Sequence, residues 1–295
     1  MISKIVTKYL LDKGMISEDQ ALLLADELTK VRAKLGLIAV HEGLMTEYQA
    51  DTVNMLQATM DKKFGDLAVE KGFLTNNQVQ ELLRKQGDPY LSVAQALENL
   101  GIMHLNDLNF LMKRYQAENE LSASSIELLK TDDIERIVPI FMPADADEYK
   151  EFAILAIKTI MRLVDNDLFL KRAYMTEDLS VNRASLQFID GDPCMSIAIC
   201  GDDDNMLEAA RIFGQEDFPC VNMDALDALA EMINCISGLH ASEVSLRRIH
   251  MELYPPDFSD NIAGITGYKM LVFPMKLKDQ DVNLVICVGE KLEFR

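Results

Sequence analysis

The chain has 295 residues, of which 49% are hydrophobic and 26% charged, enough for two domains with sizeable cores. Residues 1–116 carry 13 basic and 15 acidic side chains, so residues 117–295 hold −17 of the total net charge of −19. This acidic half argues against binding to nucleic acid or to anionic lipid, since both carry the same sign of charge.

The sequence shows no run of about 18 apolar residues, so it predicts no membrane span. Its first segment, MISKIVTKYLLDKG, has charges within the apolar stretch and is unlike a signal peptide. The cysteines are odd in number, lack CxxC spacing and lie in apolar settings, which is typical of reduced thiols. We therefore expect a cytoplasmic protein with no metal site of its own. The cysteines are Cys194, Cys200, Cys220, Cys235 and Cys287.

Residues 1–116 contain four copies of a 29-residue unit. A glycine recurs at the end of an apolar run, where it suits a left-handed helix C-cap. In the first three copies a Ser or Thr follows three residues later, where it suits an N-cap. Each copy therefore predicts helix, tight turn and helix, and we expect the hairpins to stack on a shared core. The positions are Gly14, Gly43, Gly72 and Gly101, with Ser17, Thr46 and Thr75.

Copies two and three, residues 34–57 and 63–86, are the most alike, with 24 residues each. This layout resembles the N-terminal domain of type II secretion and MshE-type ATPases, in which paired 24-residue motifs can bind cyclic di-GMP. Two lysines stand where that family has arginine, and lysine cannot make the planar two-pronged contact of a guanidinium. The alternative is a structural repeat that binds protein. The residues matched to the ligand-binding motif are Lys34, Gly36, Gly43, Gln57, Lys63, Gly65, Gly72 and Gln86.

Residues 117–147 are predicted to be a connector, polar and Ser-rich at first and then containing a short helix and an extended piece. Residues 148–295 alternate helical and extended patterns and so predict an α/β domain. Helices are expected over 148–164 and from Asp203 through Phe213. Extended segments are expected at 171–175, 185–189, 194–200, 247–255, 268–275 and 282–289, with a hairpin turn at 189–192.

One further helix is predicted over Asp224–Ser245, and it has two unlike faces. Asp227, Glu231 and Asn234 share the polar face, where the small Gly238 allows another surface to approach closely. An ordinary amphipathic helix with a solvated face is the alternative interpretation. The apolar face consists of Leu226, Leu229, Ile233, Ile236 and Val244.

The pattern D-x3-E-x2-N on this helix, followed by Pro255 and Pro256, resembles the signature of the CheC/CheX/FliY chemotaxis phosphatases. The segment NCISG at 234–238 also resembles the helix of these proteins, although the family's spacing from Asn to Pro is slightly longer. The resemblance covers residues 148–295, and the single E-x2-N copy is closer to CheX than to CheC. It implies an α+β chain: all-α repeats, then a CheX-like domain with a mostly antiparallel sheet packed against long helices.

The resemblance implies a phosphatase in chemotaxis or two-component signalling that hydrolyses the aspartyl phosphate of a CheY-type response regulator. Asn234 would orient the attacking water, Glu231 would pair with the partner's lysine, and Asp227 and Gly238 would contact the partner. Mg²⁺ would belong to the receiver, so this chain needs no cofactor, and a homodimer is expected. The alternatives are a non-catalytic signalling adaptor and a cyclic di-GMP-responsive regulator acting through the repeats.

Overall fold

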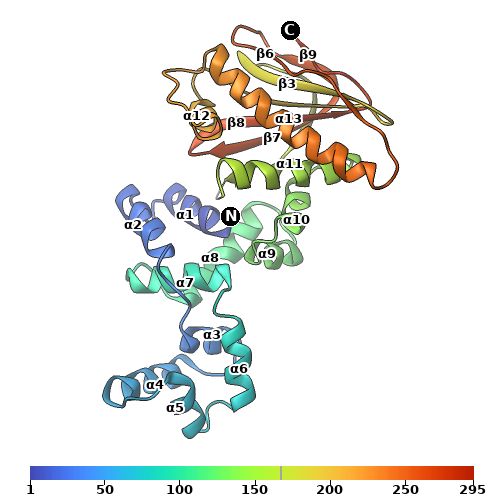
Figure 1. The fold of residues 1–295 in the computed structure, drawn as a ribbon. Helices are drawn as coiled ribbons and strands as arrows, with labels where there is room; N and C mark the ends of the chain where they lie inside the picture. Colours follow the sequence, from blue (N-terminus) through green and yellow to red (C-terminus); the bar gives the residue numbers. More distant parts are fainter. Residues whose placement is uncertain (167) are drawn as a thin grey trace. The chain divides into compact units, whose positions relative to one another are not determined.

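The computed structural model describes residues 1–166 and 168–295 (Figure 1). They form two compact units, residues 1–133 and 134–295. The boundary falls within the predicted connector. The extended piece expected there is wrong, because the segment is helical and packs its apolar side chains inward. Its elements are α9 Ala123–Lys130, α10 Ile134–Ile137 and the 3-10 helix η1 Val138–Phe141.

The first unit consists of helix pairs whose caps follow the repeat. All four repeat glycines have φ between +64° and +71°, which confirms the left-handed C-caps. Ser17, Thr46 and Thr75 each accept a hydrogen bond from the backbone three residues on, completing capping boxes with the glutamines there. The helices are α1 Ile2–Asp12, α2 Glu18–Leu28, α3 Leu35–His41, α4 Glu47–Thr59, α5 Phe64–Glu70, α6 Asn76–Arg84, α7 Pro89–Asn99 and α8 Leu105–Glu118.

The hairpins do not pack in sequence order. Helices α1 and α2 of the first copy pack on α7 of the fourth, while α3 of the second copy packs on α5 and α6 of the third (Figure 1). The chain enters and leaves the inner pair at one place, where Gln86 Nε2 donates to the carbonyl of Ala33 at 3.1 Å. Beside it, the backbone N–H of Lys34 donates to Gln95 Oε1, also at 3.1 Å. Copies two and three are therefore nested in the chain order: they form an insertion, while copies one and four pack on each other.

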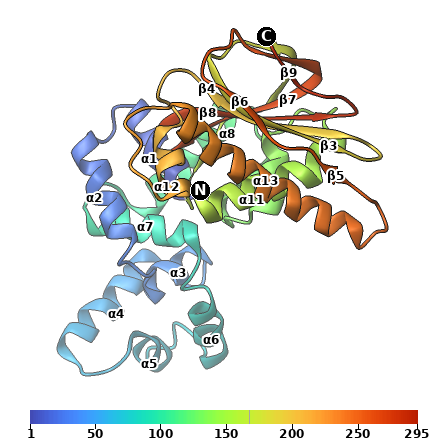
Figure 2. The ribbon, with the colours of Figure 1, turned by 45° about the horizontal axis from the view of Figure 1, so that its top comes forward.

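The second unit is an antiparallel sheet with helices packed against it (Figure 2). The strand order is β1-β7-β8-β4-β3-β5, while β2 and β9 pair with β7 and β6 pairs with β3. The expected fold class is thus confirmed: a helical N-terminal region precedes an α/β domain with an antiparallel sheet. The strands are β1 Phe169–Leu170, β2 Tyr174–Leu179, β3 Arg183–Asp190, β4 Met195–Gly201, β5 Glu252–Leu253, β6 Asp257–Ser259, β7 Ile265–Leu277, β8 Gln280–Val288 and β9 Glu293–Phe294.

The helices of this unit include η2 Asp147–Tyr149, α11 Lys150–Leu163, α12 Leu207–Gly214 and α13 Met223–Ser245. Helix α13 packs against β3, β4 and β6, and also against α11 and α12 (Figure 2). No helix among the described residues has the length and apolar character needed to cross a bilayer.

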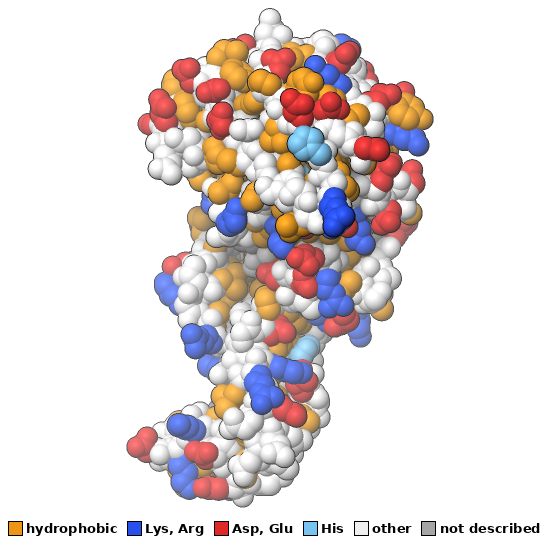
Figure 3. Space-filling model, turned by 45° about the vertical axis from the view of Figure 1, so that its right-hand side comes forward, with side chains coloured by type: hydrophobic (Ala, Val, Ile, Leu, Met, Phe, Trp, Pro, Cys, Tyr) orange, Lys and Arg blue, Asp and Glu red, His pale blue; other side chains and the backbone are white. Residues whose placement is uncertain are grey.

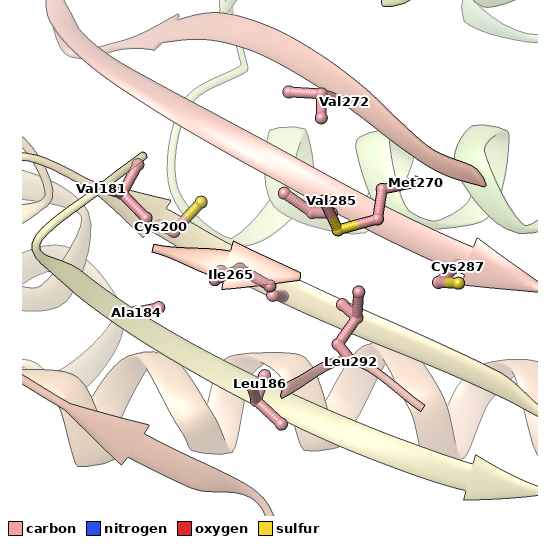
Figure 4. Close-up of a cluster of buried hydrophobic side chains, with 11 residues drawn as sticks. Val181, Ala184, Leu186, Cys200, Ile265, Met270, Val272, Val285, Cys287 and Leu292 are labelled. Atoms are coloured by element: carbon pink, nitrogen blue, oxygen red, sulfur yellow. The ribbon is translucent and has the colours of Figure 1, made fainter. Parts of the chain in front are cut away.

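The side chains of strand β3 alternate between the two faces of the sheet, so they contribute to two layers of the core. Ser185 and Gln187 form hydrogen bonds to α13. Ala184 and Leu186 point to the opposite face, into an apolar cluster (Figure 4). The cluster consists of Val181, Ala184, Leu186, Ala198, Cys200, Ile265, Met270, Val272, Val285, Cys287 and Leu292.

Some expected elements differ in the structure. The strand expected at 247–255 is reduced to β5, because α13 is followed by a turn in which Arg248 has φ +65°. The helix expected from Asp203 begins only at Leu207, because Asp203 has φ +49° and its N–H donates to Asn182 Oδ1. The hairpin turn lies at 191–194, two residues later than expected, since β3 continues through Asp190.

Candidate functional site

Helix α13 begins at a well-formed cap and separates apolar from polar residues as predicted. The Asn222 side chain accepts a hydrogen bond from the N–H of Ala225. All five residues predicted for the apolar face are buried, at 5% exposure or less. On the other side Asp227 and Glu231 are exposed and Asn234 is partly exposed. The sequence therefore places an acidic and amide stripe on an accessible face of the domain.

The Asn234 side chain accepts a hydrogen bond from a residue of the sheet on which α13 packs. Gln187 on β3 donates from Nε2 to Asn234 Oδ1 at 2.8 Å, and from the same nitrogen to the backbone carbonyl of Tyr254 at 2.8 Å. Gln187 is only 1% exposed. Because Tyr254 directly precedes Pro255, this bridge brings the proline segment of the motif to Asn234.

Sequence reasoning missed Gln187 as part of the site. The segment SLQFI places Gln187 on the same face as Ser185, a polar face that alternation with Leu186 and Phe188 would assign to solvent. Its partner could not be identified from the strand alone, since it comes from α13, 47 residues later.

Glu231 lies one turn before Asn234. The Asn234 Nδ2 group is 3.5 Å from Glu231 Oε2, the outer limit of a hydrogen bond. Within the described part of the chain, neither Glu231 nor Asp227 forms an ion pair. The stripe therefore presents carboxylates that are free to meet a cation of another molecule, next to an amide that can donate and accept.

Small and apolar side chains flank this stripe. A β-carbon on Gly238 would have no atom within 4 Å, so packing inside this chain does not require a glycine there. Cys235 is exposed, and Leu239 is 39% exposed. On the face of this unit shown in Figure 3, acidic and hydrophobic side chains are interspersed rather than gathered by kind.

The residues matched to the cyclic di-GMP motif mostly serve local structure. Lys34 and Lys63 are the exposed N-cap residues of α3 and α5. A β-carbon on Gly36 would lie 3.2 Å from the ring of Phe64, so this glycine permits close helix packing, as Gly65 does against α6. The others are the left-handed caps Gly43 and Gly72, the exposed Gln57, and Gln86, which bonds to Ala33.

In residues 1–166 and 168–295, no group of three or more His, Cys, Asp or Glu side chains is arranged to hold a metal ion.

No protein-family model and no curated protein sequence matches this chain. Among solved structures it is similar to a chemotaxis protein CheX from Desulfovibrio desulfuricans, with 16% identity, 48% of this chain and 97% of that chain covered, and a TM-score of 0.40. It is similar to CheX from Vibrio vulnificus, with 16% identity, coverages of 47% and 99%, and a TM-score of 0.40. It is also similar to a chain of a CheX-CheY-BeF3-Mg²⁺ complex from Borrelia burgdorferi, with 18% identity, coverages of 49% and 99%, and a TM-score of 0.41.

Proposed function

We propose that residues 134–295 form a CheX-like phosphatase domain that accelerates hydrolysis of the aspartyl phosphate on a CheY-type receiver. The observation that carries this proposal is the exposed D-x3-E-x2-N stripe of α13. In it the Asn234 amide is anchored by the buried Gln187, and Glu231 has no ion-pair partner among the described residues. A solvated helix face needs no such anchor beneath one of its polar side chains.

The chemistry needs little more than positioning. Phosphoryl transfer to water requires a water in line with the scissile bond and neutralisation of charge on the phosphoryl oxygens. Asn234 would hold that water through its amide, and holding reactants in place is a large source of rate. Mg²⁺ and the lysine that neutralise the phosphoryl group would belong to the receiver. Glu231 would pair with that lysine and set the docking position.

The test is the decay of a phosphorylated CheY-type receiver with Mg²⁺, in the presence and absence of the full chain. We expect faster decay, and we expect Asn234→Ala to remove most of it while the receiver still binds. Glu231→Gln should chiefly weaken binding, because it removes the charge that pairs with the lysine. Glu243→Gln is a matched control, since Glu243 is an exposed carboxylate on the same helix but off the stripe.

A non-catalytic adaptor gives a different result in the same assay. The receiver would bind, Glu231→Gln would weaken that binding, and decay would not accelerate with wild-type protein. Acceleration that survives Asn234→Ala would show a phosphatase whose water-orienting group lies elsewhere.

A further inference from the structure

We propose that Gln187 is a positioning residue that fixes the rotation of the Asn234 carboxamide, with its oxygen turned inward and its NH2 group turned to the surface. The inference deepens the function proposed above, and its effect on catalysis rests on that function. The orientation of the Asn234 carboxamide is argued from the hydrogen bonds around Gln187 alone.

The orientation of both amides follows from one fixed atom. A main-chain carbonyl only accepts, so the carbonyl of Tyr254 requires the NH2 group of Gln187 to face it at 2.8 Å. The second N–H of that group points to Asn234, which must therefore present Oδ1, at 2.8 Å. If only one of the two side-chain amides were turned over, two N–H donors or two carbonyl acceptors would face each other.

Tyr254 is itself held in place on both sides. Its N–H donates to the carbonyl of Phe188 at 3.1 Å, and its ring packs against the Phe188 ring with centroids 5.4 Å apart. Pro255 follows it, and a residue before proline is confined to extended conformations. Pro255 therefore has a role in the motif, because it restrains the Tyr254 carbonyl to which Gln187 donates.

Packing alone does not favour glutamine at this position. Gln187 is 1% exposed, and its buried Oε1 has no hydrogen-bond partner among the described residues. A buried, unpaired amide oxygen destabilises a fold, so an apolar side chain would suit the core better. What the glutamine provides is the pair of donors that connects Tyr254 to Asn234.

The orientation has a consequence for catalysis. With Oδ1 turned to Gln187, the Asn234 NH2 group lies on the outer side, 3.5 Å from Glu231 Oε2. A docked receiver would therefore meet N–H donors from Asn234, which can hold the attacking water through one lone pair of its oxygen. A freely rotating carboxamide would present this arrangement only part of the time.

The kinetic test is Gln187→Met, which keeps the length of the side chain and removes its donors. We expect the maximal rate of receiver dephosphorylation to fall at least ~10-fold, since small misplacements of a positioned group are this costly. The affinity for the receiver should stay within about 2-fold. Ser185→Ala is the matched control, because Ser185 is buried on the same face of β3 and bonds to the carbonyl of Leu226 on α13. Equal losses in both variants would reduce Gln187 to a structural role and overturn the proposal.

A double mutant separates action through Asn234 from a general effect. If Gln187 works through Asn234, then Gln187→Met should cause no further loss of rate in an Asn234→Ala background. The same fold-change in both backgrounds contradicts the inference.

A third readout needs no receiver. In NMR spectra of the ¹⁵N-labelled full chain, the side-chain NH2 resonances of Asn234 are those that disappear in the Asn234→Asp variant. We expect an order parameter near 0.85 in the wild type and below about 0.6 in Gln187→Met. A mobile carboxamide in the wild type overturns the inference, even if Gln187→Met does not fold. A rigid Asn234 in a protein that binds receivers without speeding their decay would refute the proposed function and leave the positioning role intact.

Discussion

Gly65 in α5 lies so close to Val79 in α6 that a β-carbon on the glycine would come within 2.7 Å of Val79 Cγ1. Gly65→Ala should therefore force the two helices of the third hairpin apart. Overpacking of this kind costs about 1–3 kcal/mol. Urea unfolding followed by circular dichroism should show the loss as a lower midpoint with unchanged slope. An unchanged midpoint would mean that the two helices separate without cost.

Gly238→Ala provides the contrasting case. This glycine lies inside α13 with no atom within 4 Å of an added β-carbon, so alanine should stabilise the helix by about 0.5–1 kcal/mol. The same methyl group would project from the stripe that we propose as the receiver-binding face, so receiver affinity should fall while stability rises. A variant that gains stability and binds as well as wild type would place the receiver elsewhere.

The capping boxes of the repeats should contribute measurably to stability. Thr75 Oγ1 accepts a hydrogen bond from the N–H of Gln78 at 3.3 Å, and Gln78 Oε1 accepts from the N–H of Thr75. Thr75→Ala should cost about 1 kcal/mol in urea unfolding. Thr52→Ala is the control, because the Thr52 hydroxyl bonds within α4 to the carbonyl of Tyr48 and caps no helix end. Similar losses in both variants would argue against the cap as the cause.

Cys235 offers a chemical probe of the polar stripe of α13, because it is exposed and adjacent to Asn234. Burial raises the pKa of the Cys200 thiol, and raises that of Cys287 to about 11, so these two should react slowly. N-ethylmaleimide should therefore modify Cys235 readily and block receiver binding. Cys235→Ser should bind the receiver and resist the reagent. Loss of binding in maleimide-treated Cys235→Ser would assign the effect to another thiol.

His240 should make the second unit sensitive to mild acid. It is 7% exposed, its ring lies 4.5 Å from that of Phe152, and burial lowers its pKa despite the opposing charges of Glu243 and Glu151. Because the folded pKa lies below the unfolded one, this contribution to stability is complete above about pH 6.5 and is lost as the pH falls.

The comparison of interest is wild type with His240→Gln between pH 7.5 and 5. Removing one proton-binding difference changes the slope of the unfolding free energy by at most about 1.4 kcal/mol per pH unit. We expect the wild type to lose stability more steeply below pH 6.5 than the variant. Parallel curves would assign the acid sensitivity to other groups, such as the carboxylates common to both proteins.

Local features were predictable from the sequence and distant pairings were not. The turn glycines and cap residues act within one or two helical turns, so their spacing alone predicted each hairpin. The polar stripe of α13 followed likewise from helical periodicity. The role of Gln187 depends on which strand lies under α13, and the packing of copy one on copy four depends on contacts between distant segments. The turn with Arg248 in a left-handed conformation shortened the strand expected at 247–255 to Glu252–Leu253, and nothing in the neighbours of Arg248 indicated this.

The nested order of the repeats has a consequence for how the first unit can be rebuilt. Because the chain enters and leaves copies two and three at adjacent points, at Ala33 and Gln86, those residues behave like an insertion with neighbouring ends. Excision of such a cassette and closure with a short linker, or its exchange for a cassette from another protein, should preserve the contacts of α1 and α2 with α7, while the contact of α3 with α7 is lost. A linear array lacks this property, since removing its middle repeats brings unmatched surfaces together.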